Sequence, residues 1–472
     1  MKKRVFDLKK KIKTRFLFIV HRSSNRSRMY NEKKEVSIMN DTYEQAIEYL
    51  LNIPKFAAKT TRENVLSLLE RLGNPHKSKK SIHVAGTNGK GSTCAFISQI
   101  LLEEGFHIGL FTSPHLIDLE ERFQIDGKPV DRRVFVECFE QFKKAQDIHV
   151  QEGKSHVSFF EAIFVIGALI FQRSHVDYVI YETGLGGRLD ATNVLEPEIC
   201  IITSIGFDHM QILGNTIEAI AAEKAGIIKE NTPVVYLADT DATKTIHEKA
   251  VEKKAKEIKL SKEFIKIQKK VEKYIDFCFH NSYIKYVNLK LETCADYQVE
   301  NASLAILAVH ELIPNLSKKA IYDGIYKMKW SCRMEEVLPE VYIDGAHNEP
   351  AIRRFLETMK EQEKEKALLF AVVKEKDYKK MIQLLAQSQM FQTVFVTSVG
   401  GERSLDGEQM KAHFLEAKQK NVTIIPNSKE AFISARLWQN KEKNRVLYCI
   451  GSLYLAGELY EYIKEERGKF HD

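Results

Sequence analysis

The segment HVAGTNGKGS, residues 83–92, holds three glycines, one lysine and one serine directly after an apolar run. The run 81–85 predicts a strand that stops at Gly86, and apolar positions at 96, 97, 100 and 101 predict a helix over 92–104. A strand, a glycine-rich turn and a helix in this order expose backbone N–H groups at a helix N-terminus, which attracts phosphate. The segment therefore predicts a phosphate-binding loop within a fold of alternating strands and helices.

The loop departs from the common phosphate-binding pattern G-x-x-x-x-G-K-[ST]. Val84 stands where the first glycine is expected, and Gly91 separates Lys90 from Ser92. The chemistry is preserved, because Lys90 supplies a point charge and Ser92 supplies a hydroxyl for Mg²⁺. An ordinary glycine-rich turn is the alternative for this loop taken alone. We assign nucleotide phosphate binding to the loop as a whole, with these members: Gly86, Thr87, Asn88, Gly89, Lys90, Gly91 and Ser92.

The alternation of helix and strand continues along most of the chain. Helices are expected at 43–51 and 64–72, and further strands at 107–112, 176–181 and 199–204. This order predicts an α/β fold with a mostly parallel sheet covered on both faces. Residues 256–293 differ, because the runs 274–279 and 283–291 flank a turn and predict an antiparallel appendage.

A chain of 472 residues is too long for one hydrophobic core, so more than one domain is expected. After a helix expected at 296–313, a joint is expected near 329–332. Strand and helix then alternate again, which predicts a smaller, Rossmann-like α/β domain. We therefore expect a basic leader over 1–40, a central domain over 41–330 and a C-terminal domain over 333–472. The strands expected in the last of these are 341–344, 367–373, 393–397, 422–425 and 446–450.

The charge of the chain is unevenly distributed. Residues 1–40 hold 13 Lys/Arg and 3 Asp/Glu and carry +10, whereas the whole chain carries +7, so the rest carries −3. The body therefore gives no general case for nucleic-acid binding. The apolar block 16–20 is shorter than a secretory signal requires. The leader fits a disordered tail or an upstream start with initiation at Met29 or Met39, and its arginine content leaves open a transit peptide or a tether to an anionic surface.

The remaining composition argues for a cytoplasmic protein without a membrane partner. The apolar runs fall far short of the ~20 residues that span a bilayer. The seven cysteines form no C-x-x-C pair and no metal-binding spacing. They are expected to be buried thiols in a reducing compartment.

Four expected strand ends carry polar residues suited to phosphate and metal binding. Besides the loop at 86–92, they are TSPHL at 112–116, ETGLGGRLDATN at 182–193 and SIGFDH at 204–209. In open α/β sheets, ligands bind beyond the carboxyl ends of the strands. Glu182 or His209 alone would be an ordinary loop side chain. Together the four ends offer a carboxylate, hydroxyls and an imidazole, which suit Mg²⁺ on ATP.

These segments, with EKAGIIK at 223–229 and DGAHN at 344–348, resemble the folylpolyglutamate synthase and dihydrofolate synthase family within the Mur ligases. The likeness covers roughly residues 40–460, and GTNGKGS with GLGGRLDATN is its most specific part. The resemblance implies that a folate carboxylate attacks the γ-phosphate of ATP, and that the amine of L-glutamate then attacks the acyl phosphate. TSPHL favours activity on dihydropteroate as well as on folates.

The resemblance also implies roles for single residues. Lys224 would be carbamylated, and this reaction requires a neutral amine. An exposed lysine paired with glutamate is the alternative. Lys90, Lys224 and His347 are the candidate catalytic residues, and His347 would lie beside the glutamate site. The implied ATP contacts beyond the loop are Asn301, Arg333 and Asp344. Two Mg²⁺ sites are implied, one on Ser92 and one on Ser113, Glu182 and His209.

Three positions depart from the family pattern, and two functional alternatives stay open. Residues 330–333 are WSCR where the family often has W-P-G-R, Ile163 stands where Thr is common, and Glu349 separates Asn348 from Pro350. Relatives suggest a monomer. The alternatives are a Mur-type ligase acting on another carboxylate, such as a cell-wall precursor, and a nucleotide-binding module without catalysis.

Overall fold

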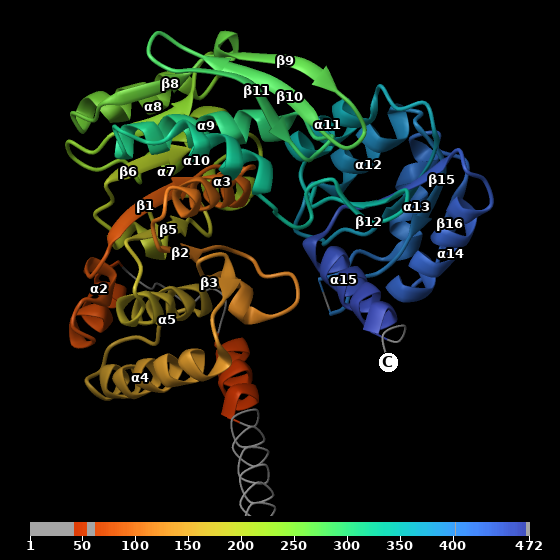
Figure 1. Ribbon diagram of the computed structural model, residues 1–472. Coiled ribbons are helices and arrows are strands. Elements are labelled where there is room, and N and C mark those ends of the chain that lie inside the picture. Colours follow the sequence, from red (N-terminus) through yellow and green to blue (C-terminus); the bar gives the residue numbers. More distant parts are fainter. Residues whose placement is uncertain (1–41, 54–61, 402, 469–472) are drawn as a thin grey trace, which may run out of the picture.

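The computed structural model describes residues 42–53, 62–401 and 403–468 of the chain (Figure 1). The leader predicted at 1–40 lies outside the described residues. In the described part, two sheets built mainly of parallel strands each carry helices on both faces, and a small antiparallel sheet lies against the larger one. The α/β fold class expected from the sequence is confirmed.

The larger sheet has eight strands in the order β4-β3-β2-β5-β1-β6-β7-β8. The strands from β2 to β8 in this order run parallel, and β3 and β4 add an antiparallel edge. Because β1 lies at the centre, its carboxyl end is flanked by those of β5 and β6. The bounds are β1 Lys80–Ala85, β2 Ile108–Phe111, β3 Phe123–Ile125, β4 Lys128–Pro129, β5 Tyr178–Glu182, β6 Ile199–Ile202, β7 Val234–Leu237 and β8 Glu257–Leu260.

Helices bury both faces of this sheet. On one face α3 packs on β1 and β2, α9 packs on β6, β7 and β8, and α10 packs on α3. On the other face α5 packs on Phe111, Val179 and Tyr181, and α4 packs on α5. Figure 1 shows these two helical layers above and below the sheet. The helices span 42–52, α2 Arg62–Arg71, α3 Lys90–Glu103, α4 Arg132–Gln151, α5 Phe159–Arg173, α6 Met210–Leu213, α7 Ile217–Ala225, α8 Thr243–Glu252, α9 Tyr297–Leu312 and α10 Lys318–Lys327. Short 3-10 turns occupy Pro75–Lys77, Leu119–Arg122, Ala191–Val194 and Lys262–Phe264.

The antiparallel sheet contains β9 Ile265–Lys270, β10 Ile275–His280 and β11 Lys285–Leu291. Alternate residues of β10 point into the core shared with α9. The expected appendage began at residue 256, but Glu257–Leu260 pairs in parallel with β7 and belongs to the larger sheet. The sequence reading also missed β9, whose side chains are mostly exposed and show no apolar alternation.

The second sheet lies at one side of the larger one and has the order β12-β13-β17-β14-β15-β16 (Figure 1). All its pairs are parallel except β12 with β13. Helices α11, α12 and α13 cover one face, and α14 and α15 cover the other. The bounds are β12 Glu335–Leu338, β13 Val341–Ile343, β14 Glu365–Phe370, β15 Phe391–Val396, β16 Val422–Ile424, β17 Arg445–Ile450, α11 Glu349–Met359, α12 Tyr378–Gln387, α13 Gly407–Glu416, α14 Ser428–Asn440 and α15 Leu453–Gly468.

Candidate active site

The glycine-rich loop joins β1 to α3 and packs tightly on the end of β6. The hydroxyls of Thr203 and Ser204 both donate to the carbonyl oxygen of Asn88, at 2.7 and 3.2 Å. A Cβ on Gly86 would lie 1.8 Å from the Thr203 hydroxyl oxygen. Gly89 has a φ of +85° and would place a Cβ 2.3 Å from the side-chain oxygen of Asn301. The backbone of the loop is therefore held in one shape that only glycine permits at these two positions.

Lys90 and Glu182 face each other across adjacent strand ends. The Lys90 Nζ lies 3.9 Å from Glu182 Oε1, and both side chains are largely buried. The backbone N–H of Ser113 donates to Glu182 Oε2 at 3.0 Å, so the end of β2 joins the same cluster. Burial raises the pKa of the Glu182 carboxyl, although the Lys90 charge and the Ser113 N–H oppose the rise. The three strand ends thus meet as the sequence predicted.

Lys224 is buried, with an exposed fraction of 4%. Its Nζ donates to the carbonyl oxygen of Gly86 at 2.7 Å, which brings the end of α7 to the phosphate-binding loop. Burial, reinforced by the charge of Lys90, lowers the pKa of Lys224 to about 7. The alternative of an exposed, glutamate-paired lysine is wrong, and the amine is poised to lose its proton near neutral pH.

Ser92 is fully buried near the start of α3, beside residues of α9. The Gln298 side-chain amide donates to Ser92 Oγ at 3.2 Å, and the Asn301 amide donates to Gln298 Oε1 at 2.9 Å. The structure therefore places Asn301 against the loop near Gly89.

Asp344 and Arg333 come from the segment that begins the second sheet. The Asp344 carboxylate accepts hydrogen bonds of 2.8 Å from the Tyr297 hydroxyl and from the N–H groups of Met334 and Ala346. Burial raises the pKa of Asp344, and the neighbouring Arg333 charge opposes that rise. Asp344 therefore holds the joint in shape, since its oxygens are already occupied by three donors.

Asn348, which follows β13 of the second sheet, contacts residues at the carboxyl edge of the larger sheet. Its side-chain amide exchanges two hydrogen bonds of 3.0 Å with the amide of Asn88 in the phosphate-binding loop. It also donates to Asp208 at 2.9 Å and caps α11 by accepting from the N–H of Ala351 at 3.0 Å. The insertion of Glu349 before Pro350 thus leaves Asn348 as a functional helix cap.

Asp208 carries a second contact between the sheets. Lys376, which follows β14, donates to Asp208 Oδ1 at 2.7 Å and lies 3.2 Å from His209 Nε2. Burial works against the Asp208 carboxylate, but Lys376 and its histidine neighbours outweigh it and hold its pKa below the ordinary value. Sequence reasoning named the segment of Asp208 but missed Lys376, because no motif marks it.

His347 and His209 both lie beside this ion pair. His347 Nδ1 is 2.7 Å from the Gly345 carbonyl oxygen and must donate to it, which leaves Nε2 unprotonated, 3.9 Å from Asp208. Burial, with the charge of Lys376, lowers the pKa of His347 to about 4. Burial also lowers the pKa of His209. Both imidazoles are therefore neutral at pH 7.

The donor set fits Mg²⁺ bound together with phosphate oxygens. The described residues contain no cluster of three or more His, Cys, Asp and Glu side chains arranged for a metal. Magnesium commonly takes one or two protein oxygens and completes its shell with water and phosphate. Ser92 and Glu182 meet that requirement. His209 Nε2 would first have to exchange its contact with Lys376.

The glycine-rich segment after β5 is mainly a structural support. Asp190 accepts hydrogen bonds from the N–H groups of Gly184, Leu185 and Thr192 and so folds the turn. A Cβ on Gly187 would come within 2.9 Å of the carbonyl oxygens at the end of α7. This close approach positions the end of α7, and therefore Lys224.

Two further segments picked out from the sequence have structural roles. His115 of TSPHL accepts a hydrogen bond of 2.9 Å from Arg122, and burial lowers its pKa to about 4. Glu161 forms a capping box with Ser158 at the start of α5. Ile163, where the family often has Thr, is fully buried in the core of that helical layer.

A cleft of about 440 Å³ opens beside the phosphate-binding loop. It is lined by Gly91, Ser113 and Glu182 on one side and by Trp330 and Arg333 on the other. A Cβ on Gly91 would lie 3.0 Å from the Trp330 ring. The joint therefore forms one wall of the cleft although it lacks the proline and glycine common in the family.

Known protein families match almost the whole described body of the chain. The Mur ligase middle domain matches residues 84–309, and the Mur ligase glutamate ligase domain matches residues 332–453. The dihydrofolate synthase/folylpolyglutamate synthase of Bacillus subtilis is 35% identical over 438 residues, which are 90% of this chain and 100% of that protein. The chain belongs to the folylpolyglutamate synthase and dihydrofolate synthase family of Mur ligases. It is an ATP-dependent ligase.

Other members of the folylpolyglutamate synthase family agree with this assignment. The folylpolyglutamate synthase of Lacticaseibacillus casei is 30% identical over 424 residues, covering 88% of this chain and 97% of that protein. The Mycobacterium tuberculosis folylpolyglutamate synthase complexed with ADP superposes with a TM-score of 0.84, at 25% identity, over 90% of this chain and 99% of that one. Escherichia coli FolC in complex with DHPP and ADP gives a TM-score of 0.80, at 26% identity, over 90% and 98%.

Proposed function

We propose that this ligase joins the amine of L-glutamate to the carboxylate of a folate, and that it accepts dihydropteroate as a second acid. The observation that carries the proposal is the meeting of Lys90, Glu182 and Lys224 with the DGAHN segment, which contacts the loop through Asn348 and Asn88. Phosphate-binding and amide-forming groups therefore share one site.

The first step transfers the γ-phosphate. The N–H groups of residues 86–91 and the Lys90 ammonium would hold the β- and γ-phosphates. Asn301 would contact the adenine, and Arg333 would reach the nucleotide from the joint that Asp344 holds in shape. The acid would lie in the cleft so that its carboxylate oxygen attacks the γ-phosphorus in line, and ADP would leave. Positioning and charge neutralisation lower this barrier, because two anions must meet.

Magnesium would be held by Ser92 at one position and by Ser113, Glu182 and His209 at another, and it would neutralise phosphate charge. Lys224 would react as a neutral amine with CO₂ to form a carbamate, which converts a buried cation beside the loop into an anion. Its pKa of about 7 supports this reaction at neutral pH.

The second step forms the amide. The amine of L-glutamate attacks the carbonyl carbon of the acyl phosphate, the proton released from its nitrogen passes to His347 Nε2, and inorganic phosphate leaves. The Asp208–Lys376 pair beside His347 carries the two charges that a zwitterionic amino acid also carries. We therefore place the glutamate ammonium at Asp208 and its carboxylate at Lys376, with the His347 Nε2 lone pair facing the amine.

We also propose an oligomeric state and a cellular compartment for the ligase. The ligase is proposed to act as a monomer. All seven cysteines are free thiols, and five of them are buried, which suits a reducing cytoplasm. Among the described residues, the helices are too short or too polar to cross a bilayer.

An ADP-release assay tests the proposal. With MgATP and L-glutamate, tetrahydrofolate and dihydropteroate should each start ADP release, and mass spectrometry of the products should count the added glutamates. D-glutamate and a UDP-linked cell-wall precursor serve as controls. Turnover only with these controls would favour another Mur-type ligase, and ATP binding without ADP release from any acid would favour a binding module.

A further inference from the structure

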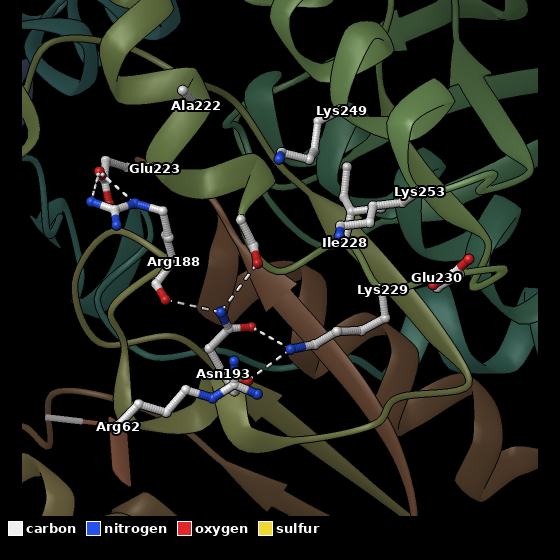
Figure 2. Close-up of a pocket in the computed structure, with 11 residues that line it drawn as sticks. Arg62, Arg188, Asn193, Ala222, Glu223, Ile228, Lys229, Glu230, Lys249 and Lys253 are labelled. Carbon is white, nitrogen blue, oxygen red and sulfur yellow. Dashed lines mark hydrogen bonds and ion pairs between the residues drawn. The ribbon is translucent and has the colours of Figure 1, made fainter.

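A second cavity, of about 420 Å³, lies outside the proposed active site. Figure 2 shows the charged groups around it, with the ends of α7 and α8 on one side and Arg62, at the start of α2, on the other. The size falls in the range of small-molecule sites in proteins. The cations among its described lining residues are Arg62, Arg188, Lys229, Lys249 and Lys253.

The cavity holds more positive charge than its acids offset. The five cations face two lining carboxylates, and one of these, Glu230, also lies 3.6 Å from Lys254 on the surface. The other, Glu223, pairs with Arg188 at 2.7 Å. Outside the basic leader the chain is slightly acidic, so this concentration of cations is local and does not reflect the composition.

Lys229 lies in the middle of this group without a carboxylate in contact, as far as the described residues show. Its Nζ donates two hydrogen bonds of 2.7 Å to the backbone and side-chain oxygens of Asn193, both uncharged. Burial, with the nearby charge of Arg62, lowers the pKa of Lys229 to about 8. An anion beside Lys229 would stabilise its charged form and offset the repulsion between Lys229 and Arg62.

Lys249 and Lys253 approach from α8. They are four residues apart, so they share one face of the helix end. Both contact the same carboxylate, Glu252, at 2.6 and 3.5 Å, and Glu252 does not line the cavity. One carboxylate outside the cavity is therefore shared by two lysines. Its single negative charge offsets only one of their two positive charges, so a net positive charge remains beside the cavity.

We propose that this basic cavity binds a small phosphorylated compound with at least two negative charges, at a place separate from the nucleotide site. Phosphate suits the lining better than carboxylate, because each phosphate monoester carries about −1.5 to −2 and accepts the planar fork of arginine. Glu223 and Gly226 line the cavity and flank Lys224, so the compound would lie behind the segment that carries this lysine.

Calorimetry with inorganic pyrophosphate tests the proposal on the full chain. The phosphate-binding loop is first saturated with Mg²⁺ and AMPPCP so that pyrophosphate cannot enter it. Wild-type protein should show saturable binding, and Lys249→Gln with Lys253→Gln should weaken it about tenfold or more. The matched control, Lys244→Gln with Lys262→Gln, removes the same charge from exposed positions outside the cavity and should leave the affinity unchanged.

Three results would overturn the proposal: no saturable binding to wild type, equal weakening in both double variants, or tighter binding of a γ-linked triglutamate than of pyrophosphate. A labelling experiment on wild type avoids any folding defect of the variants. Pyrophosphate should protect Lys229, Lys249 and Lys253 from acetylation, measured by mass spectrometry, and should leave Lys244 reactive. Acetylation of Lys229, Lys249 and Lys253 that is the same with and without pyrophosphate would also contradict the site.

Discussion

Two buried lysine–carboxylate contacts in this ligase are made in different ways. Lys90 begins α3, after the loop that follows β1, and lies 3.9 Å from Glu182, the last residue of β5. The strands β1 and β5 are neighbours, and their register pairs Val84 with Glu182. Lys376 and Asp208 lie 2.7 Å apart, but they follow strands of two different sheets. The register of one sheet holds the first pair, whereas the second requires both sheets to be in place.

This difference suggests a division of labour. We expect the phosphate-binding groups of the loop, β5 and β6 to stay assembled without the C-terminal sheet, because β1, β5 and β6 are hydrogen-bonded neighbours. The proposed glutamate site is complete only when the larger sheet and the C-terminal sheet, each with its helices, are in contact at Asp208 and Asn348. Nucleotide binding should therefore tolerate changes at this contact that amide formation does not.

The largest effect is expected from Lys90→Ala. Loss of the point charge beside the phosphates should lower kcat by ~10³-fold or more while the melting temperature stays near that of wild type. Lys77→Ala, at an exposed lysine, is the control and should retain activity in an ADP-release assay. Near-normal kcat in Lys90→Ala would remove the phosphate-binding assignment.

A smaller but still large loss, ~10²-fold in kcat, is expected from Lys224→Arg. An arginine stays charged and forms no carbamate. In wild type the folded-state pKa of about 7 means that protonation increases as pH falls through 7, so turnover should fall there and be partly restored by added bicarbonate. Carbon-13 NMR with labelled bicarbonate should show a carbamate signal in wild type alone, and an identical spectrum in both proteins would exclude the modification.

Asp208→Asn should change the second pair without disturbing the first. Lys376 then loses a buried partner, so the KM for L-glutamate should rise about 10- to 100-fold, whereas the affinity for ADP should stay within about twofold. Asp241→Asn, at an exposed aspartate, is the control. A comparable loss of ADP affinity in Asp208→Asn would show that the two contacts are not separable.

The smallest effect is expected from alanine substitutions at two glycines that have similar backbone angles. Gly89 and Gly73 have φ of +85° and +79°, but only at Gly89 would a Cβ meet another residue. Either substitution by alanine should cost about 1–2 kcal/mol of stability. Gly89→Ala alone should weaken nucleotide binding, about tenfold in a fluorescence titration, because it displaces Asn301 from the loop. Equal nucleotide affinity in the two variants would argue against a role for Asn301.

The sequence predicted those parts of the site that the ends of neighbouring strands bring together. Lys90, Glu182 and Ser113 follow strands that are adjacent in the sheet, so their meeting is a consequence of parallel topology. The contact of Lys376 with Asp208 depends on how two sheets dock, which local patterns do not encode. Lys224 shows the same limit, because its side chain is buried against the phosphate-binding loop, where it donates to the carbonyl oxygen of Gly86 far away in the sequence.

The apolar periodicity of the sequence also failed to predict strands that are short or exposed. The β9 strand exposes most of its side chains, and β8 has four residues and belongs to the parallel sheet although it precedes an antiparallel one. Both depend on pairing partners rather than on their own apolar periodicity.

The central claim is that one magnesium-bound triphosphate lies on the loop at residues 86–92, between the part of the ligase built on the larger sheet and the C-terminal part. A crystal structure with Mg²⁺ and AMPPCP tests this most directly. The account predicts a γ-phosphate within about 4 Å of the Lys90 Nζ, with Ser92 and Glu182 facing the metal. A triphosphate anchored elsewhere, including in the basic cavity beside Lys229, would contradict it.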